Sequence, residues 1–290
     1  VFTNITTEHM DYHKTISNYM DAKVELFKDL TKDSFAILNA DDESSEYFAD
    51  RTSAKILWYG IKNNADIKAE ICKESTSNIM IKLNYSGREI DMKIPFMGLH
   101  NVYNSLASVA SAISLGFELD VIKAGIETAQ VVPGRLETVP CKRGFNVVVD
   151  YAHTPHALET VLHAFKNLVK GRILLVFGCG GDRDKEKRSM MGKVADENSD
   201  IFWLTNDNPR SEDPLNIIED IKAGIKPGRT FYIQKDRRTA IEEALAEAKS
   251  DDLVLIAGKG HEKHQIIKDT IIPFDDREVV KKILSNNSDR

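Results

Sequence analysis

The fold of the second half of the chain is decided by the stretch RILLVFGCGGDRD, residues 172–184. Its apolar first part predicts a buried strand, and the glycines that follow predict a tight turn into a helix. Four further strands are expected at residues 146–149, 201–204, 230–233 and 253–257. Helical patterns, such as residues 237–248, alternate with these strands. This alternation predicts an α/β fold with a mostly parallel, Rossmann-like sheet.

The first half of the chain has a different pattern, which predicts a separate domain. Apolar residues recur at helical spacing over residues 14–30, whereas residues 67–94 alternate apolar and polar side chains, as in an antiparallel hairpin or meander. The other expected elements are strands at residues 35–39 and 55–59 around a short helix, and helices at residues 101–115 and 121–128. The stretch Val132-Pro133-Gly134-Arg135 predicts an interdomain linker. The two domains are therefore expected to span residues 1–133 and 134–290.

Length and composition limit the classes of protein to which this chain can belong. The 290 residues have room for two domains of about 150 residues each. With 42% hydrophobic and 29% charged residues this is an ordinary globular chain, and its longest apolar runs are too short to span a bilayer. A net charge of -6 with mixed signs argues against a nucleic-acid-binding surface. Cys72, Cys141 and Cys179 lie far apart, which predicts reduced thiols and no zinc site. We expect a cytoplasmic monomer with neither nucleic acid nor a membrane as partner.

Polar loops directly follow three of the expected strands. They are the glycine-rich loop with Arg183, the stretch Asp207-Asn208-Pro209-Arg210 and the stretch from Gly258 to Glu262. Loops at the carboxyl ends of parallel strands gather along one rim of the sheet, where such folds bind ligands. Arg183, Arg210 and Glu262 would then provide two cationic forks and one carboxylate, which suits a zwitterionic ligand. Taken singly, each loop could equally be a solvated Asx/Pro turn or an ordinary glycine-rich turn.

Two common nucleotide-binding motifs are absent from these 290 residues. The phosphate-binding pattern GxxxxGK[ST] does not occur. The pattern GxGxxG fails in the glycine-rich loop because position 183 is Arg. A nicotinamide-dependent dehydrogenase is therefore the least supported class of enzyme.

Polar groups in the first half have both a functional and a capping interpretation. Residues 6–13 are dense in titratable side chains, including His9, and Lys23 follows on a helix. They could bind a divalent ion, but their spacing matches no zinc site and also suits a polar helix start. Asn101 and Asn104 share one helix face, where they could contact a nucleotide base or cap the helix.

The stretch Asp150-Tyr151-Ala152-His153-Thr154-Pro155 ends one strand and opens a helix. Thr154 as the N-cap and Pro155 in the first helical turn are explained by that geometry alone. Asp150 and His153 are left at the strand end, where they could meet a ligand.

Eight stretches occur in the order found in the Mur ligases. They are TNITTEHMDYH, LNADD, GLHNVYN, PGRLE, VDYAHTP, FGCGGDRDKEKR, DNPR and GKGHE. The chain resembles the members that add the third residue of the peptidoglycan stem peptide to a UDP-N-acetylmuramoyl-dipeptide, over essentially its whole length. The DNPR stretch resembles the members that add meso-diaminopimelate, so the fold implied is part of the central ATPase domain followed by a C-terminal Rossmann-like domain.

The resemblance implies a reaction and a role for each matching residue. ATP would phosphorylate the D-glutamyl carboxylate of UDP-N-acetylmuramoyl-L-alanyl-D-glutamate, and the amine of diaminopimelate would attack the acyl phosphate, with Mg²⁺ neutralising charge. The implied catalytic and metal residues are Lys23, if it is carbamylated, and His9. The implied ATP-binding residues are Asn101 and Asn104 (base), Asp150 (ribose), Arg135 (phosphates) and His153 nearby. The implied amino-acid-binding residues are Arg183, Asp207, Asn208, Arg210, Gly258 and Glu262.

The chain departs from this family in lacking the UDP-binding domain and the phosphate loop within its 290 residues. Val1 matches a point inside the central domain, so we expect a fragment that is inactive alone but whose C-terminal domain folds. A lysine-adding or lanthionine-adding member, a folylpolyglutamate synthetase and a non-catalytic amino-acid-binding module are the alternatives.

Overall fold

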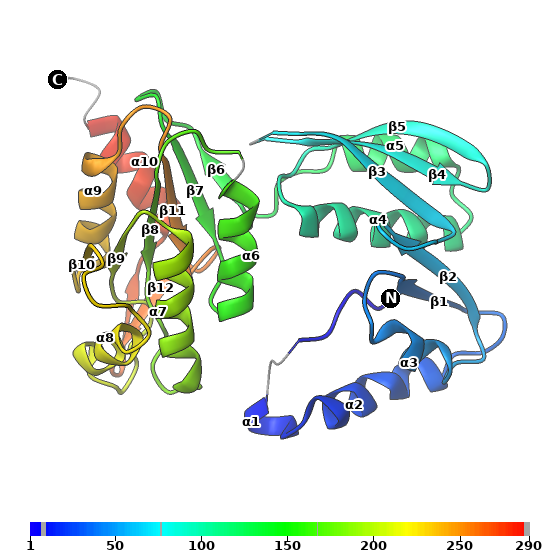
Figure 1. The fold of residues 1–290 in the computed structure, drawn as a ribbon, viewed down its shortest axis with the longest axis horizontal. Helices are drawn as coiled ribbons and strands as arrows, with labels where there is room; N and C mark the ends of the chain where they lie inside the picture. The colour runs from blue at the N-terminus through cyan, green and yellow to red at the C-terminus, as the bar shows by residue number, and fades with distance from the viewer. Residues whose placement is uncertain (7–9, 76, 167, 287–290) are drawn as a thin grey trace. The chain divides into compact units, whose positions relative to one another are not determined.

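The computed structural model of the protein describes residues 1–6, 10–75, 77–166 and 168–286. The chain forms two compact units, Val1–Gln130 and Val131–Arg290. This division lies close to the boundary that we expected between residues 133 and 134. Both units are drawn in Figure 1.

The first unit is built on a mixed five-stranded sheet. Its strands lie in the order β1-β2-β3-β4-β5; β2 pairs in parallel with β1 and β3, whereas β3–β4 and β4–β5 are antiparallel. The elements are α1 (Met10–His13), α2 (Ile16–Lys28), β1 (Phe35–Asn39), α3 (Ser45–Ala49), β2 (Lys55–Gly60), β3 (Ile67–Glu74), β4 (Ile79–Tyr85), β5 (Arg88–Ile94), α4 (Leu99–Ser114) and α5 (Leu119–Glu127). The antiparallel meander expected over residues 67–94 is confirmed.

Alternation along β1 divides the apolar interior of the first unit into two clusters. Ile37 packs into a cluster that includes Val102 and Leu106 of α4. Ala36 and Leu38 point to the opposite face, where they pack with residues of α2 and α3. The sheet is therefore covered on both faces at β1, which is typical of a strand with helices on either side.

The second unit contains a six-stranded sheet in the order β10-β9-β8-β11-β7-β6. Every neighbouring pair is parallel except β6–β7, which confirms the expected mostly parallel sheet. The elements are β6 (Glu137–Val139), β7 (Asn146–Asp150), α6 (Pro155–Lys166), β8 (Ile173–Phe177), α7 (Glu186–Asn198), β9 (Ile201–Leu204), α8 (Pro214–Lys222), β10 (Phe231–Ile233), α9 (Arg237–Glu247), β11 (Leu253–Ala257), β12 (His264–Ile267), β13 (Thr270–Pro273) and α10 (Asp276–Asn286). The antiparallel hairpin β12–β13 forms a small sheet of its own.

Helices cover both faces of the large sheet. Helices α9 and α10 pack on one face, against a cluster that includes Val147, Leu174 and Val254. Helices α6, α7 and α8 follow one another along the other side (Figure 1). Strands β8 and β11 are buried along their entire length, as expected for central parallel strands. The loops that follow these two strands are therefore anchored to the closely packed core of the sheet.

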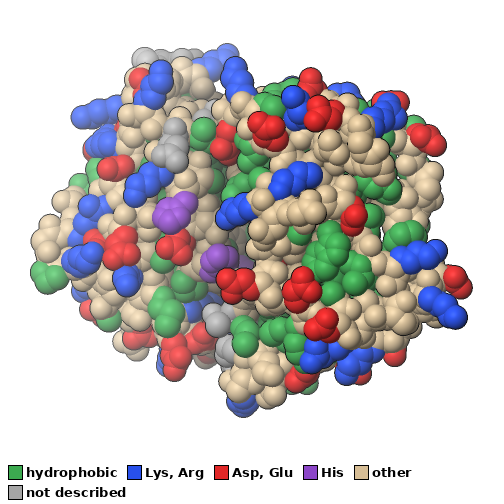
Figure 2. Space-filling view, turned by 45° about the vertical axis from the view of Figure 1, so that its right-hand side comes forward, with side chains coloured by type: hydrophobic (Ala, Val, Ile, Leu, Met, Phe, Trp, Pro, Cys, Tyr) green, Lys and Arg blue, Asp and Glu red, His purple; other side chains and the backbone are tan. Residues whose placement is uncertain are grey.

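Charged side chains of both signs are interspersed on one face of the molecule (Figure 2). On the face shown in Figure 2, Lys and Arg side chains lie among Asp and Glu side chains. No helix within the described ranges combines the length and the apolar character needed to cross a membrane.

Candidate functional site

The loops after β8, β9 and β11 meet at the carboxyl edge of the large sheet. The amide of Gly181 donates to the carbonyl of Asn208 at 2.9 Å, and Asn208 Nδ2 donates to Glu262 Oε2 at 2.9 Å. A Cβ atom built on Gly181 would lie 1.9 Å from the carbonyl oxygen of Pro209, so only glycine permits this approach. The rim predicted from the strand ends is therefore present, and it brings the loops of Arg183, Arg210 and Glu262 together.

The backbone of Arg210 is held by the hairpin strand β12. Its amide donates to the carbonyl of Ile266 at 3.1 Å, and its own carbonyl accepts from the amide of Lys268 at 2.7 Å. These bonds hold Arg210 at a φ of 50°, a left-handed conformation that costs a non-glycine residue about 1–2 kcal/mol. A strained residue persists only where its surroundings fix it, so the hairpin is part of this site.

The two arginines have unused hydrogen-bonding capacity. Arg210 Nη1 donates to the carbonyl of Gly181 at 2.8 Å, and Arg183 Nη1 donates to the carbonyl of Asp182 at 3.1 Å. Within the part of the chain that the structure describes, neither guanidinium forms an ion pair with a carboxylate. Each guanidinium carries five N–H donors, so both can still bind a carboxylate from outside.

Asn208 and Glu262 are connected through a buried lysine. Lys259 is fully buried, and its Nζ lies 3.0 Å from Asn208 Oδ1 and 2.8 Å from Glu262 Oε2. Burial alone would raise the pKa of Glu262, but the hydrogen bonds from Lys259 and Asn208 outweigh it and lower the pKa. Glu262 is therefore an anion in this site.

Asp207 is the most deeply buried carboxyl group of the rim. Loss of hydration raises its pKa, and the nearby cations Lys259 and Arg237 only partly offset this. Its backbone carbonyl accepts from Gln265 Nε2 at 2.7 Å. Its side chain lies so close to Gly258 that a Cβ atom there would be 2.7 Å from Asp207 Oδ2. Asp207 thus supports the loop from within.

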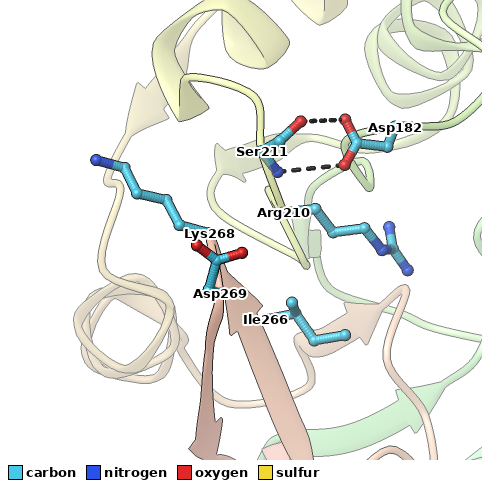
Figure 3. A pocket seen from close by; sticks show the side chains of 6 residues that line it. All are labelled: Asp182, Arg210, Ser211, Ile266, Lys268 and Asp269. Carbon is cyan, nitrogen blue, oxygen red and sulfur yellow. Dashed lines mark hydrogen bonds between the residues drawn. The ribbon is translucent and has the colours of Figure 1, made fainter.

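A pocket of about 460 Å³ opens beside Arg210 (Figure 3). Its lining residues are Asp182, Arg210, Ser211, Ile266, Lys268 and Asp269. Ser211 holds the Asp182 carboxylate through its hydroxyl at 2.6 Å and its amide at 3.2 Å, so this carboxylate is already engaged. Arg210 and Lys268 extend in opposite directions in the view of Figure 3.

A second group of predicted residues surrounds Tyr151, after β7. The Arg135 guanidinium lies over the Tyr151 ring at 4.6 Å, and His153 Nδ1 lies 2.9 Å from the Tyr151 carbonyl oxygen. The Asp150 carboxylate, which we expected to be free for a ligand, accepts backbone hydrogen bonds from Leu136 and Ala152, both at 2.7 Å. Asp150 therefore fixes the start of the second unit as well as being a candidate ligand contact.

In the first unit the predicted amide pair is formed. Asn104 Nδ2 donates to Asn101 Oδ1 at 3.2 Å, and Asn101 Nδ2 donates to the carbonyl of Met97 at 2.8 Å. Asn101 is thus fixed at the start of α4, while Asn104 is exposed. The side-chain oxygen and one N–H of Asn104 have no partner among the described residues, and such groups fit the edge of a nucleotide base.

The candidate metal residues are only partly placed. Lys23 is exposed on α2 with its Nζ 4.7 Å from the centre of the Tyr19 ring, and His9 lies outside the described residues. Across the described ranges, no group of three or more His, Cys, Asp or Glu side chains is arranged to hold a metal ion. An unmodified ammonium group cannot ligate Mg²⁺, so Lys23 would need carbamylation to do so.

Comparison with known families agrees with the order of the motifs. The Mur ligase middle domain matches residues 1–112, and the Mur ligase, glutamate ligase domain matches residues 134–260. The chain belongs to the Mur ligase family.

Individual Mur ligases are similar along nearly the whole chain. The chain is 45% identical over 287 residues to UDP-N-acetylmuramoyl-L-alanyl-D-glutamate–2,6-diaminopimelate ligase 1 of Clostridium acetobutylicum, covering 98% of this chain and 58% of that protein. A solved structure of a UDP-N-acetylmuramoyl-L-alanyl-D-glutamate–2,6-diaminopimelate ligase is 34% identical, with a TM-score of 0.66, covering 98% of this chain and 59% of that one. The MurF ligase from Thermotoga maritima in complex with ADP has a TM-score of 0.73 at 18% identity, covering 98% and 60%, and shows the shared fold alone. The chain spans less than two thirds of these Mur ligases.

Several residues that shape this Mur ligase site were not identified from the sequence. Lys259 lies inside the GKGHE stretch, and Arg188 ends the FGCGGDRDKEKR stretch, so the motifs contained them without indicating a role. Both are fully buried although charged, which hydrophobic patterning does not predict. Gln265 and Glu212 carry no sequence signal, because their importance comes from contacts with distant loops.

Proposed function

We propose that this chain serves in the ATP-dependent addition of meso-diaminopimelate to UDP-N-acetylmuramoyl-L-alanyl-D-glutamate. The observation that carries the proposal is the meeting of three loops: those of Arg183 and Arg210, whose guanidinium groups have no carboxylate partners among the described residues, and that of Glu262, which is an anion bound to Asn208. The diaminopimelate ligases to which the chain is similar support the choice of amino acid.

Diaminopimelate matches the rim in charge and number of groups. Its two carboxylates suit the forks of Arg183 and Arg210, and an ammonium group suits Glu262. Asn208 Nδ2 donates one N–H to Glu262 and has no second acceptor among the described residues, so we propose that its other N–H meets a ligand carboxylate. Lysine has a single carboxylate, so it would leave the guanidinium group of either Arg183 or Arg210 without a partner.

The proposed reaction forms one amide bond and consumes one ATP. The D-glutamyl carboxylate attacks the γ-phosphorus and ADP leaves, which gives an acyl phosphate. The diaminopimelate amine then attacks the acyl carbon, and inorganic phosphate leaves with the bonding electrons. The amine must be unprotonated at that moment, so its proton passes to a base or to water.

Within each unit, taken by itself, we propose candidate nucleotide contacts. In the first unit, Asn101 would orient the exposed amide of Asn104 toward the base. In the second unit, Arg135 would meet the phosphates from its place over the Tyr151 ring, and Asp150 would meet the ribose, with His153 nearby. The described residues do not provide a complete ligand set for Mg²⁺, so we propose Lys23 and His9 as its candidates and derive no step from them.

Isothermal titration calorimetry on the 290-residue chain tests the amino-acid assignment. We expect meso-diaminopimelate to bind more tightly than L-lysine, and Arg210→Ala to remove most of that difference. Loss of a charged hydrogen-bonding partner weakens binding by roughly tenfold or more. Equal affinity for both amino acids, or an Arg210→Ala chain that discriminates as the native chain does, would contradict the proposal.

A further inference from the structure

Lys259 is a fully buried cation for which the proposed reaction gives no role. Burying an ammonium group is costly unless it is paired and hydrogen-bonded. Here the cost is offset by two bonds, to Asn208 Oδ1 at 3.0 Å and to Glu262 Oε2 at 2.8 Å. Both partners belong to the amino-acid rim, whereas Lys259 itself has no exposed surface through which to contact a ligand.

We propose that Lys259 is a positioning residue for amino-acid recognition, which fixes the amide orientation of Asn208 and keeps Glu262 charged toward the ammonium group of the ligand. This inference rests on the proposed function, since it assigns Lys259 to the same rim.

The orientation of Asn208 follows from its donors and acceptors. Its Oδ1 accepts from both Lys259 Nζ and the amide of Ile266, the latter at 3.0 Å. If the amide group were flipped, Nδ2 would face these two donors, and Oδ1 would face Glu262 Oε2. Each of these contacts would then place a donor against a donor or an acceptor against an acceptor. Lys259 and Ile266 thus direct the N–H groups of Asn208 to the side of Glu262, where one is left for a ligand carboxylate.

The charge of Glu262 also depends on Lys259. Oε2 accepts from Lys259 and Asn208, whereas Oε1 accepts no hydrogen bond from the residues that the structure describes. Oε1 is therefore the oxygen that can receive an ammonium group. Burial raises the pKa of Glu262 and the hydrogen bond from Lys259 is the largest influence that lowers it, so removal of Lys259 would raise this pKa.

Other charged groups around Glu262 come from the neighbouring loops and helices. They are His264 on β12, Asp207 on the rim, and the Arg237–Asp276 pair, in which both side chains are fully buried. The Arg237–Asp276 pair is neutral as a whole, and His264 lies at the exposed end of the hairpin. None of these groups is hydrogen-bonded to Glu262 within the described residues, whereas Lys259 is, so Lys259 has the largest influence in keeping Glu262 charged.

The first arm of the test uses the native chain without any amino acid. Carbon-13 NMR of the glutamate carboxyl groups, with Glu262 assigned through Glu262→Gln, gives the pH at which Glu262 titrates. We expect that midpoint to lie below the ordinary glutamate value of about 4.3. A midpoint at or above the ordinary value would overturn the inference, whether or not the chain binds an amino acid.

The second arm compares Lys259→Met with Lys263→Met, a matched control that removes an exposed lysine from the same loop. In Lys259→Met we expect the Glu262 midpoint to rise and the affinity for meso-diaminopimelate at pH 7 to fall by about tenfold or more. The loss of affinity on acidification should also begin at a higher pH, which a purely structural role would not produce. Lys263→Met should show none of these changes.

The outcomes separate the two proposals. If the native chain does not bind meso-diaminopimelate, the proposed function fails, while the titration of Glu262 still decides the role of Lys259. If the native chain binds but Lys259→Met matches it in affinity and pH profile, the positioning role fails alone. Should Lys259→Met not fold, as judged by thermal unfolding, the native titration decides.

Discussion

The guanidinium of Arg188 and the carboxylate of Glu212 form two parallel hydrogen bonds, Nη2 to Oε1 at 2.8 Å and Nη1 to Oε2 at 2.9 Å. Arg188 is fully buried on α7, and Glu212 follows Arg210 in the chain by two positions. Glu212 Oε1 also accepts from the amide of Asp182 at 2.6 Å. One carboxylate therefore joins a helix to the two loops that carry Arg183 and Arg210.

We expect Glu212→Gln to destabilise the chain by roughly 2–3 kcal/mol, because it leaves a buried guanidinium with only part of its charge compensated. Arg188 retains a bond to Asp220 at 2.9 Å, which limits the loss. Urea denaturation measures the effect. Glu219→Gln serves as the control, since the Glu219–Lys222 pair is largely exposed and should contribute less than about 1 kcal/mol. Equal losses in the two variants would contradict this role for Glu212.

The effect of Glu212 should depend on pH in a defined direction. The hydrogen bonds from Arg188 lower the pKa of Glu212 to about 2. A carboxyl group whose pKa is lowered by folding stabilises the folded state at any pH above its pKa in the unfolded chain. That stability is lost as the pH falls toward its pKa in the folded state. The stability difference between native chain and Glu212→Gln should therefore shrink between about pH 4.5 and pH 2. A constant difference over this range would show that charge is not the cause.

The central strands of the second unit could be predicted because buried strands consist of apolar residues. Strands β8 and β11 are apolar at every position, and burial on both faces requires this. Strand β6 has only three residues, and β12 and β13 have four each, with adjacent isoleucines in place of an apolar–polar alternation. The hairpin β12–β13 was missed for that reason, although it holds the backbone of Arg210.

The rim of the site could be predicted from topology, but its internal bonds could not. Parallel strands place their carboxyl ends together, which is enough to group Arg183, Arg210 and Glu262. No such rule indicates that Lys259 turns inward to Asn208, or that both oxygens of Asp150 bind backbone amides. The bonds of Lys259 with Asn208 and of Leu136 with Asp150 join residues that are distant in sequence, so they follow from the folded backbone and not from local pattern.

Asp207 should make the stability of the chain depend on pH in the opposite sense to Glu212. Burial raises the pKa of Asp207, so the folded state prefers its protonated form. Below the ordinary aspartate value the group is protonated in both states and has no effect. As the pH rises from the ordinary aspartate pKa to the raised pKa of Asp207 in the folded state, ionisation favours the unfolded chain and the folded state loses stability. The free energy of unfolding of Asp207→Asn should therefore increase relative to that of the native chain over this range.

Urea denaturation of both chains at a series of pH values measures this trend. The amide of Asn does not titrate, so any constant difference in packing cancels from the slope. A difference that is flat with pH, or that grows in favour of the native chain, would show that Asp207 is ionised in the fold without penalty.

A side chain at Gly258 should destabilise the chain for two separable reasons. Its φ of 115° lies in a region that L-residues avoid, and a Cβ atom would come within 2.7 Å of Asp207 Oδ2. Gly228 provides the control in the same unit, because its φ is 83° but a Cβ atom there would meet nothing within 4 Å. Gly228→Ala should cost about 1 kcal/mol from backbone strain alone, and Gly258→Ala should cost at least about 1 kcal/mol more.

The two alanine variants should also differ in amino-acid binding. A contact against Asp207 displaces the loop next to Asn208, so Gly258→Ala should weaken the binding of meso-diaminopimelate in calorimetry, whereas Gly228→Ala should leave it within about twofold. If both variants lose the same stability and bind alike, the close approach of Gly258 to Asp207 has no part in shaping the rim. If Gly258→Ala loses stability but keeps its affinity, the strain lies in the backbone and the carboxylate of Asp207 is free to move aside.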